Sequence, residues 1–375
     1  MFDIIIVANK YPIQGKYGGE FVRARLKYYT SFLKVAVIDL GANRKVISEE
    51  TMDNIPVIRS SYKLLLETLA KFPAKVLGIH SPSEAVFSSS LKFYKPHQII
   101  TWHHGSESLD LSKHYSFIAT DCSFHKWKQV RSYQQDKLNF IKELVENPEV
   151  TKIFVSDYLL QTTTEDALAI PQNIRIIHNN ITDEFFLPPD SVNFSSKKKI
   201  MVLRDFSSTK AADIAMGIIN RMAMQPEFEN LEITIYGFGQ HWDAWTSPIK
   251  NYANVRLFEG YIDQNNIINL MQGQDILIVP TRHDTQGLVM CEAMAAGMLC
   301  VVNSIAAIPE FISNNEGVLV NSESPYTIVD ELFKVLKNKE DYISRRKNAM
   351  TRALAQCGLE NTITKEIALI KEKLN

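Results

Sequence analysis

The sequence of 375 residues lacks the features that mark several specialised protein classes. Its four cysteines are scattered, with no CxxC motif and no Cys/His pairs at metal-ligand spacing, so we expect reduced, mostly buried thiols and no structural zinc. The formal net charge of −1 argues against bulk binding of nucleic acid. No apolar run spans a membrane, and the run in the N-terminal MFDIIIVANKYP is too short for a signal peptide. We therefore expect a cytoplasmic protein with no nucleic-acid partner.

Motifs of common enzyme classes are missing as well. The sequence holds no GxGxxG, which argues against an NAD-dependent dehydrogenase, and no GxxxxGK[ST] phosphate-binding loop. It holds no GxSxG, so nothing supports a hydrolase triad. There is no DxD, a frequent anchor for divalent metals, and no His/Asp/Glu cluster with metal spacing. We therefore expect neither a metal nor a cofactor.

The features that are present predict an α/β fold. An apolar fraction of 45% with 22% charged residues is typical of a soluble globular protein, and the length suits two domains. Short apolar runs such as FDIIIVAN, LKVAVIDL, HQIITWHH, KKIMVLRD, LEITIYGFG and DILIVPT alternate with helical patterns. Strands that alternate with helices form parallel sheets covered on both faces. Two such series predict two doubly wound domains that bind ligands at the carboxyl ends of their strands.

A linker separates the two series. Residues Phe185–Lys199, FFLPPDSVNFSSKKK, combine a proline pair with polar residues and a lysine run. The lysines read as a solvated linker rather than a nucleic-acid patch. We place an N-terminal domain at residues 1–188 and a C-terminal domain at residues 197–353.

The segment Thr281–Gly297, TRHDTQGLVMCEAMAAG, is the most informative part of the sequence. It follows the apolar run ILIVP, which reads as a buried parallel strand, and its LVMCEAMAA is a strong helix former. Free N–H groups at Gly287, Leu288 and Val289 would form an anion site at the start of that helix. Asp284 and Glu292 flank this site and can accept hydrogen bonds from hydroxyls. A phosphate between two hydroxyl acceptors describes a nucleotide sugar.

Two further groups of residues suit a phosphate. Gly18 and Gly19 follow the first predicted strand and precede a helix, so the backbone there can approach a phosphate or a sugar, although a flexible loop is the plainer interpretation. Arg204 and Lys210 follow the strand KKIMVL. Cations at the carboxyl end of a strand suit a diphosphate, and taken alone they are two surface cations.

The histidine pair His103-His104 ends the predicted strand HQIITW. A histidine at that position can hydrogen-bond a substrate hydroxyl or carry a proton, although a single one is more often structural. Two other segments, Phe21–Lys34 and Phe124–Lys142, are basic and aromatic. Either segment could rest on anionic lipid, and Phe21–Lys34 would do so through Arg23, Arg25, Lys27 and Lys34; a solvated helix face is the alternative.

Taken together, these motifs resemble the retaining glycosyltransferases of family 4, often called group 1 glycosyltransferases. DTQGLVMCEAMAAGMLCVV matches the family's EGFGLVxLEAMAxGxPVV from Asp284 to Val302, with Asp in place of the first Glu. IRIIHNNITDEFFLP is similar to VIxNGVDxxxFxP, and MVLRDFSSTKAAD to the family's strand with its Arg and Lys. NVRLFEGYIDQNNIINLMQGQDILIVPT and AAIPEFI have counterparts in the same order. The similarity runs over nearly the whole chain and is strongest in Lys198–Leu319.

This resemblance implies a GT-B fold, with two Rossmann-like domains facing across a cleft and a helix over residues 354–375 crossing back to the N-terminal domain. The C-terminal domain would hold the nucleotide sugar, expected to be UDP-linked, and the N-terminal domain a glycan or lipid-linked glycan acceptor. Glu292 would bind the ribose, Asp284 with the Gly287–Val289 backbone the donor sugar and diphosphate, and Arg204 with Lys210 the leaving diphosphate in place of a metal. Gly18 and Gly19 would close over the diphosphate. His104 would touch the donor sugar, with His103 as the alternative.

The sequence departs from the family at three places, where Asp284 is one methylene shorter than Glu, Gln286 replaces an aromatic or Met, and Ala306-Ala307 replaces a glycine pair. These changes bear on the identity of the donor sugar. The predicted function is a retaining, metal-independent transferase that builds cell-surface polysaccharide or lipid-linked oligosaccharide at the inner face of the cell membrane. The alternative is a non-catalytic GT-B subunit that binds a partner enzyme or a glycan.

Overall fold

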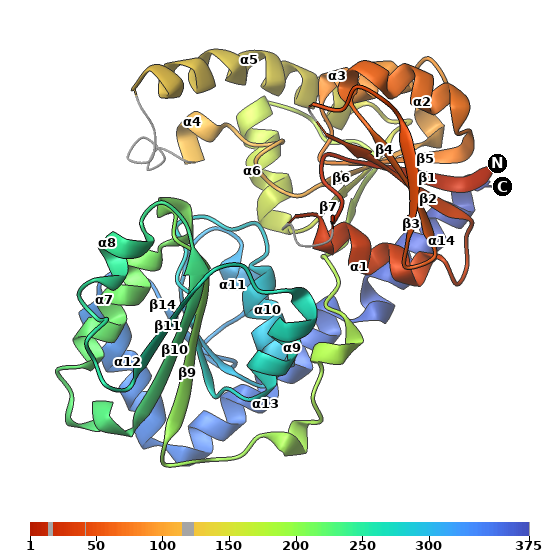
Figure 1. Ribbon diagram of the computed structural model, residues 1–375. Coiled ribbons are helices and arrows are strands. Elements are labelled where there is room, and N and C mark those ends of the chain that lie inside the picture. Colours follow the sequence, from red (N-terminus) through yellow and green to blue (C-terminus); the bar gives the residue numbers. More distant parts are fainter. Residues whose placement is uncertain (14–17, 42, 115–123, 375) are drawn as a thin grey trace. The chain divides into compact units, whose positions relative to one another are not determined.

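The computed structural model describes residues 1–13, 18–41, 43–114 and 124–374. The chain forms two compact units, each built around its own sheet (Figure 1). The N-terminal unit comprises Met1–His114, His125–Asn180 and Leu359–Asn375, and Ile181–Gly358 lie in the C-terminal unit. The chain therefore passes between the units at Asn180–Ile181 and again at Gly358–Leu359. The second passage follows the predicted residue 354 because helix α13 (Lys339–Cys357) continues past it.

The described part of the N-terminal unit holds an eight-stranded sheet in the order β3-β4-β2-β1-β5-β6-β7-β8. All pairs are parallel except the antiparallel β3–β4 pair at one edge. Its central strands are buried on both faces, as expected for parallel strands covered by helices. The strands are β1 Phe2–Ala8, β2 Val35–Leu40, β3 Ser48–Met52, β4 Ile55–Ser60, β5 Ala74–His80, β6 Ile99–His103, β7 Thr151–Phe154 and β8 Ile174–Ile176.

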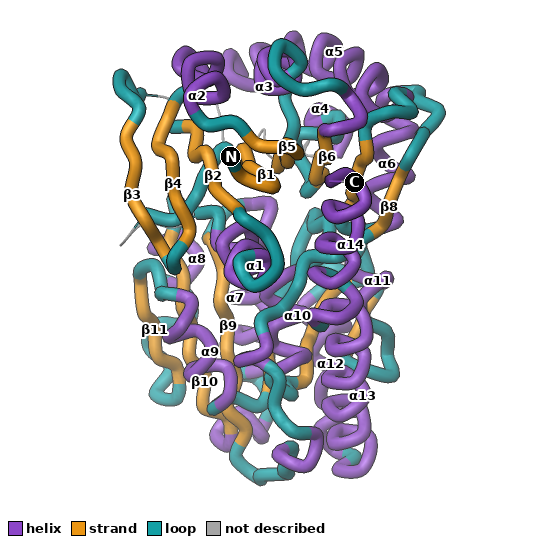
Figure 2. The backbone as a smooth tube through the Cα atoms, turned by 90° about the vertical axis from the view of Figure 1, so that its right-hand side faces the viewer, coloured by secondary structure: helices purple, strands orange, loops and turns teal. Residues whose placement is uncertain are grey.

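Helices cover both faces of this sheet. Helices α1 and α14 lie side by side on one face, and α2 and α3 lie on the other (Figure 2). The core beneath α1 and α14 joins alternate strand residues such as Ile4 and Ile6 to Leu26 and Ile370 from the helices. The helices of this unit are α1 Glu20–Tyr29, α2 Leu65–Lys71, α3 Glu84–Ser90, α4 Leu111–His114, α5 Phe124–Glu146, α6 Asp157–Ala167 and α14 Ile363–Leu374.

A buried ionic network fastens α14 to α1. Glu366 accepts hydrogen bonds from Tyr29 Oη at 2.5 Å, Trp102 Nε1 at 2.8 Å and Arg25 Nε at 3.3 Å. Arg25 and Glu366 are both 0% exposed. The expectation that Arg25 contacts a membrane is therefore wrong, because Arg25 is buried and forms an ion pair with Glu366 near the C-terminus.

The β3–β4 hairpin at the sheet edge was not among the strands that the sequence indicates. β3 reads SEETM and is almost entirely exposed, so it carries no apolar alternation, and β4 begins with a proline at its second position. The hairpin matters for the neighbouring loop. Arg59 of β4 donates to the Tyr11 and Pro12 carbonyls at 3.1 and 2.8 Å, and so anchors the chain that leads to Gly18 and Gly19.

The described part of the C-terminal unit holds a six-stranded parallel sheet in the order β11-β10-β9-β12-β13-β14. Its first strand, β9, therefore lies between β10 and β12, and the strand order reverses there. A doubly wound sheet binds its ligand at that switch point, beyond the carboxyl ends of the strands. The strands are β9 Lys198–Asp205, β10 Leu231–Phe238, β11 Val255–Glu259, β12 Ile276–Ile278, β13 Leu299–Asn303 and β14 Val318–Val320.

Helices pack on both faces of this second sheet as well. Residues of α7 and α12 meet the strands in one large core cluster, which includes Ile218, Val301 and Leu332. Helices α10 and α13 contact each other and β13. The helices are α7 Ala212–Met222, α8 Trp242–Thr246, α9 Gln264–Gln272, α10 Leu288–Ala295, α11 Ile308–Phe311, α12 Pro325–Lys337 and α13 Lys339–Cys357.

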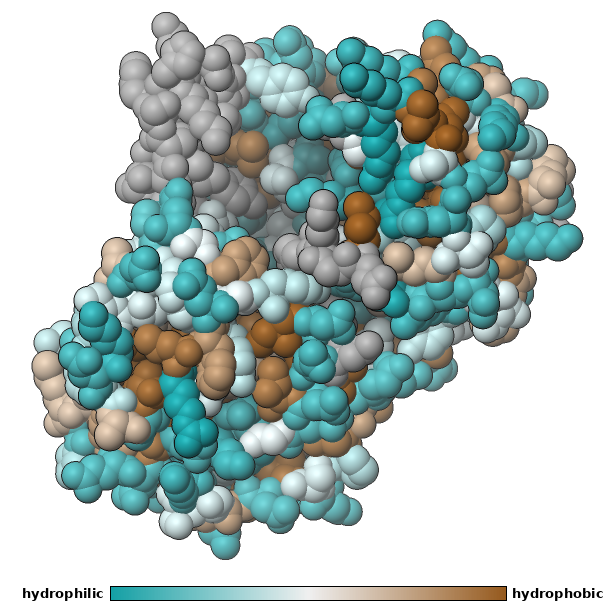
Figure 3. All heavy atoms as spheres, in the orientation of Figure 1, coloured by the Kyte–Doolittle hydropathy of each residue, from teal (hydrophilic) through white to brown (hydrophobic). Residues whose placement is uncertain are grey.

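Within the described residues, no helix combines the length and the apolar character needed to cross a membrane. On the face shown in Figure 3, hydrophilic and hydrophobic side chains are interleaved over both units. Three cysteines are free and buried, namely Cys291, Cys300 and Cys357, and the fourth, Cys122, lies outside the described residues.

Candidate active site

The predicted phosphate-binding residues of the C-terminal unit lie at the switch point of its sheet. Arg204 is near the end of β9, and Lys210 is in the short turn that follows it. Asp284 lies in the loop after β12, and Gly287 begins helix α10. The fold thus brings these four residues, far apart in the sequence, to one edge of one sheet.

Arg204 joins the ends of the two central strands. Its guanidinium donates to the Val279 and Pro280 carbonyls at 2.9 and 2.8 Å, while its buried Nε has no hydrogen-bond partner in the described chain. Burial lowers the pKa of Arg204 to about 10, and the nearby carboxylates of Asp284 and Asp205 oppose that shift. The side chain therefore remains a fixed positive charge at neutral pH.

Lys210 and Asp284 form an ion pair beside Arg204, with Lys210 Nζ 3.0 Å from Asp284 Oδ2. Burial by itself would raise the pKa of Asp284, but Lys210, Arg204 and the Gly287 N–H hold it well below its ordinary value. Asp284 is consequently ionised throughout the neutral range. Two cations, Lys210 and Arg204, therefore lie next to the ionised Asp284 at this corner of the sheet.

The start of helix α10 differs from the expectation in one respect. Gly287 has φ 77°, in the left-handed region that favours glycine, and its N–H donates to Asp284 Oδ1 at 2.9 Å. That donor is therefore occupied by the protein's own carboxylate. The N–H groups of Leu288 and Val289 belong to the first helical turn, where donors have no partner within the helix. Of the three N–H groups predicted to bind an anion, those of Leu288 and Val289 therefore remain as candidates.

Glu292 is half-buried in the middle of α10, on a helix whose other residues are mostly buried. It follows the N–H groups of Leu288 and Val289 by about one helical turn. Arg282 was not among the predicted site residues, and it contacts the turn that carries Lys210. It donates to Asp213 at 2.9 and 2.7 Å and to the Ser208 carbonyl at 2.9 Å, which fixes the turn that carries Lys210. Nothing in the sequence distinguishes Arg282 from a surface cation.

The predicted residues of the N-terminal unit lie at the carboxyl edge of its own sheet. Gly18 and Gly19 have φ 132° and 83°, and Gly19 caps the start of α1. A Cβ at Gly19 would overlap the Lys10 carbonyl, so this position requires glycine. The close approach of the two backbone segments, rather than flexibility, explains the residue.

The two adjacent histidines have different environments. His103 is fully buried and uses both ring nitrogens, Nδ1 with Ser108 Oγ at 2.7 Å and Nε2 with Thr101 Oγ1 at 3.1 Å. Burial lowers its pKa to about 3. His104 is only partly buried, and its Nε2 is 2.8 Å from Nδ1 of His80. Burial also lowers the pKa of His104, so its ring is neutral at physiological pH. Of the two histidines, only His104 therefore has part of its side chain accessible.

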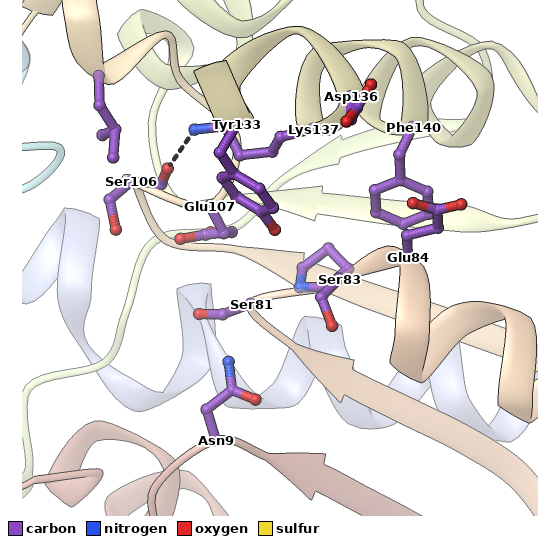
Figure 4. Close-up of a pocket in the computed structure, with 12 residues that line it drawn as sticks. Asn9, Ser81, Ser83, Glu84, Ser106, Glu107, Tyr133, Asp136, Lys137 and Phe140 are labelled. Atoms are coloured by element: carbon purple, nitrogen blue, oxygen red, sulfur yellow. Dashed lines mark hydrogen bonds between the residues drawn. The ribbon is translucent and has the colours of Figure 1, made fainter. Parts of the chain in front are cut away.

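A cavity of about 310 Å³ opens within the N-terminal unit, lined in part by Ser106 and Glu107 of the loop after β6. Figure 4 shows side chains from helix α5 above it, the loop after β5 below it, and Asn9 from the end of β1 pointing toward Ser81. Its polar lining was not predicted from the sequence, because the lining residues come from four separate segments. The most prominent of them are Asn9, Ser81, Ser83, Glu84, Glu107, Tyr133, Asp136 and Lys137.

Among the described residues, no group of three or more His, Cys, Asp or Glu side chains has an arrangement that could hold a metal ion. Residues 184–352 match the family described as glycosyl transferases group 1. The chain is a glycosyltransferase. The matched segment contains Arg204, Lys210, Asp284 and Gly287, the residues gathered at the switch point, and also Glu292.

Similar proteins agree with this assignment. The glycosyltransferase is 23% identical over 295 residues to an uncharacterised 41.2 kDa protein in the cps region of Klebsiella pneumoniae, covering 76% of each chain. It is 24% identical over 212 residues to N-acetyl-alpha-D-glucosaminyl L-malate synthase of Bacillus anthracis, covering 54% of each. The structure of Anabaena Alr3699/HepE in complex with UDP superposes with a TM-score of 0.73 and 13% identity over 99% of each chain. The predicted GT-B fold of two parallel-sheet domains is confirmed.

Proposed function

We propose that this glycosyltransferase is a retaining, metal-independent enzyme of family 4, which transfers a sugar from a UDP-linked donor to a glycan acceptor in the synthesis of cell-surface polysaccharide. The observation that carries the proposal is the cluster of Arg204, Lys210 and the α10 N-terminus at the switch point of the C-terminal sheet. A diphosphate leaving group develops negative charge as the glycosidic bond breaks, and fixed positive groups at that position stabilise the transition state.

Each residue has a distinct part in the proposed reaction. Lys210 and Arg204 neutralise the departing diphosphate, and the N–H groups of Leu288 and Val289 donate to its oxygens. Asp284 accepts hydrogen bonds from the donor sugar and forms an ion pair with Lys210. Glu292 binds the ribose hydroxyls from the next turn of α10. In the N-terminal unit, Gly18 and Gly19 approach the diphosphate and His104 contacts the donor sugar.

The donor and the pathway are inferred from the relatives. The Anabaena protein was crystallised with UDP, which supports a UDP-linked donor here. The Klebsiella relative lies in a cps region, which supports a role in polysaccharide synthesis. A small hydroxy acid is the rival acceptor class, because the Bacillus relative is named for malate.

Turnover in the presence of EDTA tests metal independence. We expect full activity with a UDP-sugar after chelation, because Arg204, Lys210 and the α10 N-terminus supply the charge that a metal would otherwise supply. Loss of activity that Mn²⁺ or Mg²⁺ restores would refute this part of the proposal. The anomeric configuration of the product, read by NMR early in the reaction, tests retention.

Calorimetry with UDP alone tests the division of labour between the two carboxylates. Glu292→Ala should weaken UDP binding, because the ribose contact is lost. Asp284→Ala should leave UDP affinity nearly unchanged and lower sugar transfer, because its hydroxyl contacts are to the sugar. Equal losses of UDP affinity in the two variants would contradict the assigned roles.

A lipid-linked acceptor at the inner face of the cell membrane is a further part of the proposal. On α1 and the turn after it, Lys27 and Lys34 are exposed, and Phe32 is 60% exposed beside them. Each cation near an anionic surface contributes about 1 kcal/mol, so this attachment is weak and sensitive to salt. The second basic segment, Phe124–Lys142, falls partly on residues whose side chains lie outside the described set.

Flotation with phosphatidylglycerol vesicles tests the membrane contact. We expect wild-type protein to float at low salt and the double variant Lys27→Ser/Lys34→Ser to stay in solution. The control is Lys63→Ser/Lys71→Ser, which removes two exposed cations elsewhere in the N-terminal unit. If wild type does not float, or if both pairs act alike, the contact through this segment is wrong.

A further inference from the structure

The cavity of the N-terminal unit carries an unusual balance of charge. Among the residues whose side chains are described, three carboxylates line it, from Glu84, Glu107 and Asp136, against the single cation of Lys137. Its volume of about 310 Å³ is at the lower end of the range for small-ligand pockets. Which ligands the cavity accepts therefore depends on whether the Lys137 ammonium is free to bind an anion.

The ammonium group of Lys137 is hydrogen-bonded within the protein. Its ammonium group donates to the Ser106 carbonyl at 3.0 Å and also to the Leu109 carbonyl, and Figure 4 shows it reaching Ser106. Burial lowers the pKa of Lys137 to about 8, with Glu107 and Asp110 opposing the shift. The ammonium thus fastens the loop after β6 to helix α5. It is not directed at a ligand anion.

Glu107 is held so that half of its carboxylate remains available. Its Oε1 accepts the backbone N–H groups of His104 and Gly105, the latter at 3.0 Å. Neither of these two hydrogen bonds uses Oε2, and the N–H of Glu107 itself is a third backbone donor to the carboxylate. Because two backbone donors already hold the carboxylate in place, a ligand that binds it restricts little further side-chain freedom. It lies beside His104, the residue assigned to the donor sugar.

The remaining lining suits a polyhydroxylated ligand. Ser81 and Ser83 offer hydroxyl groups, and Asn9 is oriented by Tyr62, whose hydroxyl donates to Asn9 Oδ1 at 2.7 Å. That bond occupies Asn9 Oδ1, and Figure 4 shows the amide nitrogen of Asn9 on the side that faces Ser81. The Tyr133 ring is 61% exposed over the cavity, as a face on which the apolar side of a sugar ring can pack. Carboxylates, hydroxyls and an aromatic ring together form hydrogen bonds and stacking contacts with a sugar.

We propose that this cavity binds the terminal sugar of the acceptor, that this sugar is uncharged, and that Glu107 Oε2 accepts a hydrogen bond from one of its hydroxyls. The inference rests on the proposed glycosyltransferase function and narrows its acceptor class. Acceptors that end in a carboxylate or a phosphate are rejected, because they would face three carboxylates and a lysine already bonded elsewhere. A hydroxy diacid such as malate belongs to the rejected class.

Direct binding without any donor tests the proposal independently of transfer. The probes are matched pairs that differ only in charge, namely methyl α-D-glucoside with methyl α-D-glucuronide, and methyl α-D-galactoside with methyl α-D-galacturonide. Malate and glucose 1-phosphate complete the set. Saturation-transfer NMR titrations should give the neutral member of at least one pair an affinity tenfold or more above its acidic partner, malate and glucose 1-phosphate.

Variants then assign the effect to the cavity. Glu107→Gln keeps an oxygen for the backbone donors and places an amide where Oε2 was, so the affinity for the neutral glycoside should fall about tenfold. Glu84→Lys/Asp136→Lys reverses two exposed lining charges and should raise the affinity for the uronides. Glu143→Gln, an exposed carboxylate on α5 outside the cavity, should change neither.

The outcomes separate this proposal from the proposed function. Equal or tighter binding of the acidic probes, absence of binding by every neutral glycoside, or an unchanged affinity in Glu107→Gln would each overturn it. The donor site is followed separately by UDP binding and by hydrolysis of a UDP-sugar without acceptor, neither of which the control Glu143→Gln should alter. If the wild-type protein neither binds UDP nor hydrolyses a UDP-sugar, the proposed function itself is refuted.

Discussion

The buried pair of Arg25 and Glu366 offers the sharpest test of how the C-terminal helix is held. Glu366 on α14 accepts three hydrogen bonds, from α1 and from β6, at a site with no solvent exposure. Burial and the adjacent carboxylate raise the pKa of Tyr29 well above its ordinary value, so its hydroxyl remains a donor. Glu366→Ala removes the common acceptor and leaves the Arg25 charge uncompensated.

The expected loss follows from that geometry. Removal of one partner of a buried ion pair costs about 3–5 kcal/mol, because the other charge stays buried without compensation. In a domain of this size, each kcal/mol lowers Tm by roughly 2–4 °C, so Glu366→Ala should lower the Tm of the N-terminal unit by roughly 6–20 °C. The exposed pair of Lys71 and Glu49 gives the comparison, and Glu49→Ala should cost at most about 1 kcal/mol.

A double-mutant cycle isolates the pair. Arg25→Met, Glu366→Leu and the double variant are compared by urea unfolding followed by circular dichroism, together with the wild type. The double variant should be more stable than Glu366→Leu alone, because no charge is then buried without a partner. The reasoning fails if the stability losses of the two single variants add up to the loss of the double variant within about 0.5 kcal/mol. It also fails if Glu366→Ala lowers stability less than the exposed control Glu49→Ala does.

Three other perturbations follow from the site. Lys210→Ala should weaken UDP binding by about 10- to 150-fold in calorimetry, the equivalent of a charge-assisted hydrogen bond, while the exposed control Lys250→Ala should leave it unchanged. Gly19→Ala should lower Tm more than Gly260→Ala does, since both glycines have positive φ but only Gly19 faces a backbone carbonyl; equal shifts in thermal melts would reject the steric argument. His103 has a lowered pKa of about 3, so the unfolded chain binds its proton first, and stability present above about pH 6.5 is lost as the pH falls. Urea midpoints at pH 6.5 and 5.0 should show that His103→Gln removes about 2 kcal/mol of this acid loss, and an unchanged loss would mean that His103 titrates normally.

Local patterns of apolar and turn residues in the sequence predicted the two parallel sheets and most helices. Apolar runs bounded by turn residues marked β1, β9 and β12, because strands buried on both faces need unbroken apolar residues. The β3 strand escaped this reasoning, since it is exposed and has a sheet neighbour on one side only. Edge strands are stabilised by pairing, which leaves no periodic signal in the residues themselves.

The sequence by itself determined the class of fold and the residue types of the donor site, because helix starts, strand ends and their charged neighbours are encoded within short segments. Only the tertiary structure decided how those residues are used. The occupation of the Gly287 N–H by Asp284, the burial of Arg25 against Glu366 and the engagement of both His103 nitrogens each depend on a partner that folding supplies. The N-terminal cavity was invisible for the same reason, since Asn9, Ser81, Glu107 and Tyr133 become neighbours only when separate strands and a helix converge. A hydrogen bond or an ion pair is fixed by distance in space, and distance along the chain does not report it.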